Sequence, residues 1–210
     1  MAIRRDDMRP GESISGDQYV CRTPGRLAHT RGKENAALRY HGGTIFTDHY
    51  SGFIFIGNQV SLRIGETLRT KRAFDRFAAE HGVRLQHFRL DNHPFDSKEF
   101  REDLADLGQD VSFSWVGAHH QNGVAERAQS TVMSWTRSQM LHQLLHWPEA
   151  ADNDLWPFAL ENAVHIWNHL PDRTSGLTPY EKFTGQVTPS SYNPLTTARV
   201  WGCPSFVLDP

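Results

Sequence analysis

The sequence predicts an α/β domain in which a five-stranded mixed sheet is flanked by helices, followed by a loop-rich C-terminal extension. Short β-branched and aromatic runs alternate with longer segments of helical periodicity. Their order is three strands, helix, strand, helix, strand, long helix and helix. A hairpin gives antiparallel neighbours and strand-helix-strand units give parallel ones, so the sheet should be mixed. At 210 residues, the chain can bury a substantial core.

The first three strands carry the clearest β pattern. We expect a strand at 15–22, in which Asp17, Tyr19 and Cys21 share one face. Segments 44–47 and 53–56 are strongly β-patterned, and the turn between them predicts a hairpin. Asp17 on an inward face is unusual, because a buried acid needs polar partners or a metal.

Two helices and two strands follow. Segment 66–82 predicts an amphipathic helix, with Gly82 just past its C-terminus. Its buried stripe is Leu68, Phe74, Phe77 and Ala78, and its basic residues, interpreted as an ordinary exposed face, are Arg69, Lys71, Arg72 and Arg76. Strand 85–90 ends at Asp91. Ser97 is a candidate N-cap for a helix whose stripe is Phe100, Leu104 and Leu107, stopped by Gly108, and strand 111–116 follows.

A long helix is predicted from Asn122, as N-cap, to Trp147, where Pro148 ends it. Helical geometry places its main apolar stripe at Val124, Ala128, Val132 and Trp135. Glu126, Ser130, Met133 and Arg137 lie roughly opposite. A further helix is expected at 155–170, with a stripe of Trp156, Leu160, Ala163 and Trp167, and a last short strand at 204–208.

Composition limits the class of protein. The formal net charge of −2 excludes a domain that holds nucleic acid by bulk positive charge alone. Two distant cysteines, Cys21 and Cys203, indicate a reducing, intracellular compartment, and no apolar run approaches membrane-spanning length. We divide the chain into a polar lead-in at 1–12, a core at 13–171 and an extension at 172–210.

Two acids occupy positions typical of a metal site. Asp91 follows a strand directly, and Glu126 falls in the first turn of the long helix, 35 positions later. That interval is sufficient for a helix, a strand and a loop to bring the second carboxylate back beside the first. Two carboxylates so placed suit a divalent cation such as Mg²⁺.

Several stretches resemble one family. They are 46–53 (Phe-Thr-Asp-His-Tyr-Ser-Gly-Phe), 90–92 (Leu-Asp-Asn), 120–127 (His-Gln-Asn-Gly-Val-Ala-Glu-Arg), 176–181 (Gly-Leu-Thr-Pro-Tyr-Glu) and 200–204 (Val-Trp-Gly-Cys-Pro). Together they resemble the integrase core of copia-type LTR retrotransposons, within the DDE group of strand transferases. The resemblance covers nearly the whole chain and implies an RNase H-like fold. It also implies 3′-end processing and strand transfer of element DNA into target DNA.

The resemblance implies three metal-binding acids. The first is Asp17, in the middle of the first strand; Asp48, in the hairpin turn, is the second choice, because an Asp in a tight turn can instead bond backbone amides. Asp17 would bridge two Mg²⁺ or Mn²⁺ ions, with Asp91 on one and Glu126 on the other. The implied partners are double-stranded DNA, as element ends and target, and further copies of the chain. The site of action is the nucleus if the host is eukaryotic.

Candidate DNA contacts surround Glu126. Gln121, Ser130 and Arg137 share or adjoin its helix face and could meet phosphate, although a solvated face explains them equally well. Asn122 either orients DNA or simply caps the helix. Two further pairs, His142 with His146 and His165 with His169, have helical zinc-ligand spacing, but we interpret them as packing and surface histidines.

Two departures from the family pattern define the alternatives. The family usually has Gly and a small residue after Asp-Asn, where this chain has His93 and Pro94. A catalytically inactive RNase H-like domain that binds DNA or protein is therefore one alternative, and a generic RNase H-like nuclease is another. The chain also lacks the cysteines for the His-His-Cys-Cys zinc module that precedes copia-type cores. It therefore resembles a core fragment of a longer polyprotein or a degenerate reading frame.

Overall fold

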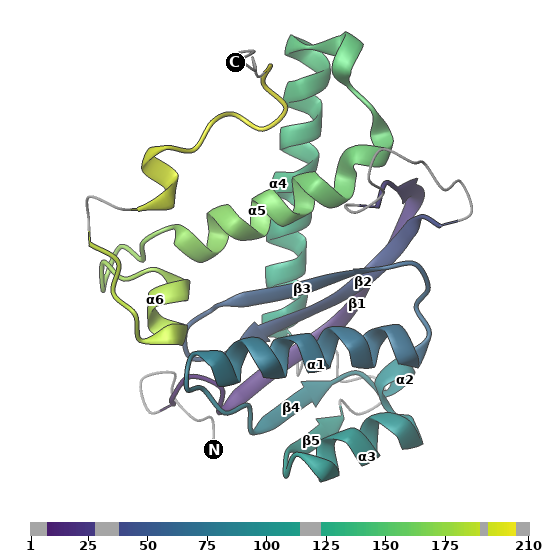
Figure 1. Ribbon diagram of the computed structural model, residues 1–210, viewed down its shortest axis with the longest axis vertical. Coiled ribbons are helices and arrows are strands. Elements are labelled where there is room, and N and C mark those ends of the chain that lie inside the picture. The colour runs from purple at the N-terminus through teal and green to yellow at the C-terminus, as the bar shows by residue number, and fades with distance from the viewer. Residues whose placement is uncertain (1–7, 28–37, 114–122, 190–192, 205–210) are drawn as a thin grey trace, which may run out of the picture.

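A five-stranded sheet in the order β3-β2-β1-β4-β5 runs through the protein (Figure 1). This computed structural model describes residues 8–27, 38–113, 123–189 and 193–204. The strands are β1 (Ser13–Gly25), β2 (Tyr40–Asp48), β3 (Ile54–Gln59), β4 (His87–Leu90) and β5 (Asp110–Phe113). β1 pairs antiparallel with β2, and β2 with β3, whereas β1–β4 and β4–β5 are parallel. The predicted mixed sheet is confirmed.

Helices cover both faces of this sheet, α1 and α3 on one face and α4 and α5 on the other (Figure 1). They are α1 (Ile64–Glu80), α2 (Asn92–Phe95), α3 (Lys98–Asp106), α4 (Gly123–His146), α5 (Trp156–His169) and α6 (Pro179–Thr184). Short 3₁₀ turns lie at Pro148–Ala150, Asn153–Leu155 and Pro194–Thr196. The Ser97 hydroxyl accepts a bond from Phe100 N, as expected of an N-cap. Gly82 and Gly108 follow their helices with positive φ, which glycine adopts without strain.

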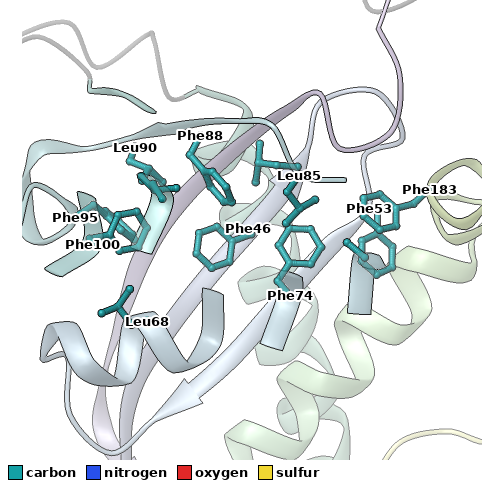
Figure 2. Packing of buried hydrophobic residues seen from close by; sticks show 13 residues of the cluster. Phe46, Phe53, Leu68, Phe74, Leu85, Phe88, Leu90, Phe95, Phe100 and Phe183 are labelled. Carbon is teal, nitrogen blue, oxygen red and sulfur yellow. The ribbon is translucent and has the colours of Figure 1, made fainter. Parts of the chain in front are cut away.

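Aromatic rings fill the core between the sheet and α1 (Figure 2). The Phe46 ring lies 5.9 Å from that of Phe74, and the Phe53 ring lies 4.7 Å from that of Phe183. Phe183 comes from α6, so the C-terminal segment completes this core. Leu107 was expected in the stripe of α3, but it is 46% exposed. It follows the last residue of α3, and the helical stripe therefore no longer applies to it.

The opposite face of the sheet packs against α4 and α5. Ile45 belongs to this second core and its neighbour Phe46 to the first, as strand alternation requires. The buried residues of α4 are Ala125, Ala128, Val132, Thr136 and Gln143. The predicted stripe was therefore partly wrong. Val124 and Trp135 are only half-buried, and Trp135 instead packs its ring 5.7 Å from that of Trp167 at the edge of the α4–α5 contact.

Lys71 corrects the interpretation of α1 as having a uniformly exposed basic face. Arg69, Arg72 and Arg76 are exposed, but the Lys71 side chain is fully buried. Its Nζ lies 2.7 Å from Asp103 Oδ2 and 3.0 Å from Asp75 Oδ2. Because two carboxylates neutralise the ammonium group, its long apolar stem can pack in the core.

The extension contains one element that the pattern did not predict. Helix α6 begins with a capping box: Thr178 Oγ1 accepts from Glu181 N, and a Glu181 carboxylate oxygen accepts from Thr178 N. Of the predicted last strand, only Pro204 lies within the described residues, and of strand 111–116 only the first three residues do. Cys21 and Cys203 are both free thiols. In the part of the chain that the structure describes, no helix is long and apolar enough to cross a membrane.

Candidate active site

Asp17 and Asp91 are brought together by the parallel pairing of β1 with β4. Gly16 pairs with Leu90, and the residue that follows each of them in sequence is an aspartate. Neighbouring strands lie about 4.8 Å apart. The pairing is tight at this point, since a Cβ on Gly16 would come within 2.6 Å of the Leu90 side chain and 2.8 Å of the Phe46 ring. Asp91 is the N-cap of α2 without a side-chain cap bond, so capping does not engage its carboxylate.

Glu126 reaches the same place from the other layer. Alternation along β1 puts Asp17 on the face with Tyr19, which belongs to the core beneath α4. Ala125 and Ala128 bury the first turns of α4, leaving Glu126 exposed beside that core. The charges of Asp91 and Glu126 both act on the Asp17 carboxylate, so the three acids lie in one region beside the β1–α4 contact.

The pKa of Asp17 reflects both its burial and the nearness of the other two acids. Burial is the main cause that raises the pKa of Asp17 from 3.8 to about 6. A 2.7 Å bond from Gln18 N to Asp17 Oδ1 acts in the opposite direction, while the charges of Asp91 and Glu126 raise the pKa further. The charges of Asp91 and Glu126 thus repel an ionised Asp17, and a bound cation would reduce that repulsion.

The described side chains do not already form a coordination shell. Within the described ranges, no group of three or more His, Cys, Asp or Glu side chains is placed to hold a metal ion. The donor set nevertheless fits a hard cation such as Mg²⁺, which prefers carboxylate oxygens and retains waters. Asp17 is half-buried and held by a backbone amide, whereas the Glu126 side chain is exposed.

Asp48, the second choice for the first acid, is fully engaged in the fold. Its side chain is completely buried. Oδ1 accepts from Gly11 N at 2.9 Å, and Oδ2 accepts from Ser51 N at 2.8 Å and from Ser51 Oγ at 2.6 Å. These bonds tie the turn after β2 to the residues that precede β1. The geometry therefore gives Asp48 a structural role and leaves Asp17 beside the other two acids.

The candidate DNA contacts divide between described and undescribed residues. Gln121 and Asn122 lie outside the described residues. Ser130 and Arg137 are exposed and share the Glu126 face of α4. Arg137 also lines a hollow of about 700 Å³ between β1 and α4. Sequence reasoning missed Arg22 and Gln129, which line the same hollow; the spacing of Gln129 three residues after Glu126 was the available signal.

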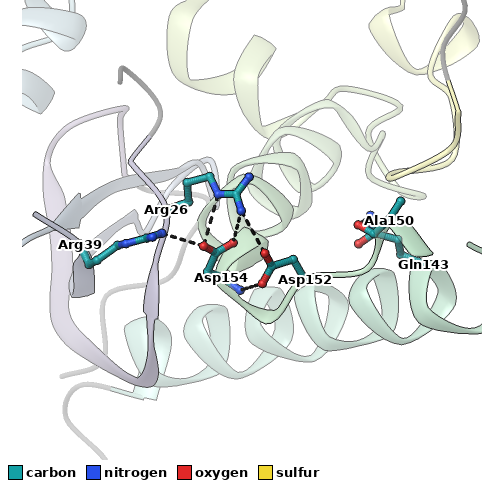
Figure 3. A network of polar contacts seen from close by, with 6 residues as sticks. All are labelled: Arg26, Arg39, Gln143, Ala150, Asp152 and Asp154. Carbon is teal, nitrogen blue, oxygen red and sulfur yellow. Dashed lines mark hydrogen bonds and ion pairs between the residues drawn. The ribbon is translucent and has the colours of Figure 1, made fainter. Parts of the chain in front are cut away.

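A charged network lies near this hollow and involves Arg26, Arg39, Asp152 and Asp154 (Figure 3). Arg26 Nη2 lies 2.9 Å from Asp152 Oδ2 and 3.2 Å from Asp154 Oδ1. Arg39 Nη1 lies 2.7 Å from Asp154 Oδ2. In addition, Trp156 Nε1 donates to Thr23 O at 2.8 Å. The far end of the β1–β2 hairpin is thereby fastened to the connection between α4 and α5. No local sequence pattern predicts these contacts, because they join residues more than 100 positions apart.

This sheet order, with helices on both faces, matches the RNase H-like fold of retroviral integrase catalytic cores. The HTLV-2 integrase catalytic core domain, solved in complex with magnesium in a trimeric form, matches with a TM-score of 0.59 and 18% identity, over 84% of this chain and 98% of that one. The simian T-cell lymphotropic virus intasome, in complex with PP2A regulatory subunit B56 gamma, matches with a TM-score of 0.63 and 15% identity, over 100% of this chain and 63% of that one.

The BIV integrase catalytic core domain gives the same result, with a TM-score of 0.58 and 14% identity over 83% of this chain and 95% of that one. At such low identity these likenesses establish the fold. No family model and no curated protein matches the sequence.

Proposed function

We propose that this chain is the catalytic core of a DNA integrase that carries out metal-dependent 3′-end processing and strand transfer of retrotransposon DNA into target DNA. The observation that carries the proposal is the parallel pairing of Gly16 with Leu90, which sets Asp17 beside Asp91; the charges of Asp91 and Glu126 both act on the Asp17 carboxylate. The integrase-core fold supports the reaction class. The resemblance of 120–127 and 176–181 to copia-type elements supports the finer assignment.

Asp17, Asp91 and Glu126 would hold the metal. Two Mg²⁺ or Mn²⁺ ions held by these carboxylates would supply a lowered pKa of the attacking hydroxyl or water and stabilisation of the leaving oxygen. The chain supplies the rigidity: Gln18 N orients Asp17 Oδ1, and β1 is the middle strand of the sheet. Glu126 brings its carboxylate from the opposite layer. The magnesium in the HTLV-2 core structures supports the choice of ion.

DNA would approach along the Glu126 face of α4. Ser130 and Arg137 lie one and three turns beyond Glu126, and Arg22 stands across the hollow from Arg137. This is a local cationic track on a chain whose net charge is −2, as phosphate contact would require here. We assign double-stranded DNA and further copies of the chain as partners; the dimeric, trimeric and intasome forms of the similar structures support an oligomer. In a eukaryotic host the reaction would take place in the nucleus.

The decisive experiment measures 3′-end processing and joining in parallel. A labelled oligonucleotide that mimics an element end is incubated with the protein, target DNA and Mg²⁺, and 3′-processed and joined products are separated. Asp91→Asn and Glu126→Gln should each reduce both products by at least about a hundredfold, since each removes a charged metal ligand. Glu102→Gln, whose side chain is 61% exposed on α3, is the matched control and should leave both products unchanged. Equal activity in all the variants would reject the assignment.

A non-catalytic RNase H-like domain is the second candidate. The departure at His93 and Pro94 favours it, because it lies directly after the Asp91-Asn92 pair. This candidate predicts no stabilisation by Mg²⁺ or Mn²⁺ and no product, with DNA binding intact. A generic nuclease would instead give cleavage without joining.

A further inference from the structure

A histidine pair on α5 lies outside the acid site. His165 and His169 are one helical turn apart, and their ring centroids are separated by 4.3 Å with the planes at 40°. His165 is exposed and His169 half-buried. Two imidazoles on one metal at about 2.1 Å per bond have ring centres about 5 Å apart. A small rotation of the exposed His165 ring therefore brings the pair into chelating geometry.

The His169 ring is already held in the form that a metal requires. Its Nδ1 lies 2.8 Å from the backbone oxygen of His165. A carbonyl oxygen only accepts, so Nδ1 carries the proton and Nε2 keeps its lone pair. Imidazole ligands in metal sites commonly donate their second nitrogen to a carbonyl in this way. The ring also stacks on Tyr180 at 5.2 Å, and the Tyr180 hydroxyl lies 3.3 Å from His81 Nε2.

The electrostatic surroundings also favour a metal cation. Glu181 adds negative charge nearby. Glu181 lines the same hollow as His169, and its carboxylate oxygens accept from Thr178 N and Thr188 N at 2.8 Å.

We propose that His165 and His169 form a two-imidazole site for a borderline transition-metal ion such as Ni²⁺, Zn²⁺ or Cu²⁺. The metal class follows from the donors, since imidazole suits these ions and carboxylate suits Mg²⁺. No third His, Cys, Asp or Glu ligand completes the group among the described residues, so water fills the remaining positions. This site is separate from the acid cluster and does not depend on the proposed function.

The metal would stabilise a turn of α5 that holds the sheet. Trp167 Nε1 donates to Gly52 O at 2.9 Å. Asn168 accepts from Ile54 N at 2.9 Å and donates to Ile54 O at 2.8 Å. These two residues lie between the two ligands in sequence. A chelate across them therefore opposes fraying of the turn that fixes β3.

The pair His142 and His146 on α4 is the matched control. Its ring centroids are 4.2 Å apart, so its spacing is equivalent. However, Trp147 crowds both rings at 5.7 and 5.8 Å. His142 Nδ1 is buried and has no hydrogen-bond partner among the described residues, so no carbonyl fixes its tautomer. The same four-residue spacing thus lacks the preorganisation seen on α5.

The test measures the thermal unfolding midpoint of the whole chain with NiCl₂ as the probe and a thiol-free buffer. Ni²⁺ at a hundredfold above its Kd should raise the midpoint by about 5–10 °C. His165→Gln, at an exposed position, should weaken Ni²⁺ binding in calorimetry by at least tenfold, whereas His142→Gln and Asp91→Asn should keep it. The same concentration of Mg²⁺ should not reproduce the effect. The proposal fails if Ni²⁺ does not shift the midpoint, or if His165→Gln retains the shift that His142→Gln loses.

Discussion

Ser51 Oγ donates a 2.6 Å hydrogen bond to Asp48 Oδ2, inside a turn where the Asp48 side chain is completely buried. Asp17 lies across the β1–β2 pairing, three residues beyond the Asp48 partner Ile14. The surroundings of the two carboxylates differ: Asp48 accepts hydrogen bonds from three donors, whereas Asp17 lies near two further acids. One hairpin thus contains an aspartate that stabilises the fold, Asp48, and an aspartate that adds to a cluster of negative charge, Asp17. The predictions below separate the two uses.

Asp48→Ala should destabilise the protein without altering its response to Mg²⁺. The substitution leaves Gly11 N and Ser51 N without their acceptor in a buried turn. Each unsatisfied buried donor costs about 1–3 kcal/mol, so a loss of about 3 kcal/mol is expected. Urea denaturation with and without Mg²⁺ measures both quantities. A variant of normal stability that no longer binds Mg²⁺ would instead make Asp48 the metal ligand.

Asp17→Asn should stabilise the metal-free protein at pH 7. The folded pKa of Asp17 is about 6 and its ordinary value is 3.8, so the ionised folded form is penalised. The penalty is complete above about pH 6 and disappears as the pH falls towards 3.8. Allowing for solvent screening of a half-buried group, the gain is about 1–2 kcal/mol at pH 7.

Denaturation in EDTA at pH 7 and at pH 5 tests this sign. The advantage of Asp17→Asn over the wild type should be larger at pH 7, while Asp106→Asn, at an exposed position, should show no such difference. The variant should also lose stabilisation by Mg²⁺. A less stable Asp17→Asn protein in EDTA at pH 7 would show that the acid cluster is not a source of strain.

Sequence patterns predicted the layers well because alternation and helical periodicity are local properties. Ile45 and Phe46 enter different cores, as period two requires. The prediction that Lys71 is exposed was wrong because its partner Asp103 is 32 positions away, and nothing local in the sequence shows that the ammonium group will be neutralised. The choice between Asp17 and Asp48 as the first metal-binding acid depends in the same way on residues distant in sequence. It depends on where Gly11 N donates, 37 positions from Asp48.

Lys71→Met should be strongly destabilising although α1 looks basic and amphipathic. Although burial acts to raise it, bonds from Lys71 and Arg72 hold the pKa of Asp103 below its ordinary value. Removing Lys71 leaves that buried carboxylate undercompensated, at a cost of about 3–5 kcal/mol at pH 7. The stabilisation from Asp103 is present above its ordinary pKa and is lost as the pH falls through its lowered folded value. The cost of Lys71→Met should therefore shrink in acid.

Chemical denaturation at pH 7 and pH 2.5 measures this difference, because the loss occurs below the ordinary Asp103 pKa of 3.8. Arg69→Met is the control, because the Arg69 side chain is 76% exposed and should contribute less than about 1 kcal/mol. Equal effects of the two substitutions would mean that the buried ammonium group is dispensable.

Glu181→Ala should loosen the whole C-terminal segment. One Glu181 oxygen accepts from Thr178 N and the other from Thr188 N, both at 2.8 Å, so this side chain holds both ends of α6. α6 in turn places Phe183 in the aromatic core. The Thr-Pro-Tyr-Glu stretch at 178–181 therefore stabilises α6 and the segment that follows it. We expect a loss of about 2–3 kcal/mol and higher protease sensitivity after residue 170. Glu80→Ala, at an exposed site, should change neither.

Asp154→Ala should free the end of the β1–β2 hairpin while leaving the sheet intact. The Asp154 carboxylate contacts both Arg26 and Arg39, and its backbone oxygen accepts from Arg26 N at 2.7 Å, a bond that the substitution retains. These partly exposed ion pairs contribute on the order of 1 kcal/mol, so global stability should fall only slightly. Amide exchange should accelerate at Arg22, Thr23 and Gly25, the first two of which line the hollow beside Arg137, and remain slow at 14–18. If strand transfer uses that hollow, DNA affinity should fall with it. Uniform acceleration across β1 would show that Asp154 supports the sheet as a whole and not the hairpin end.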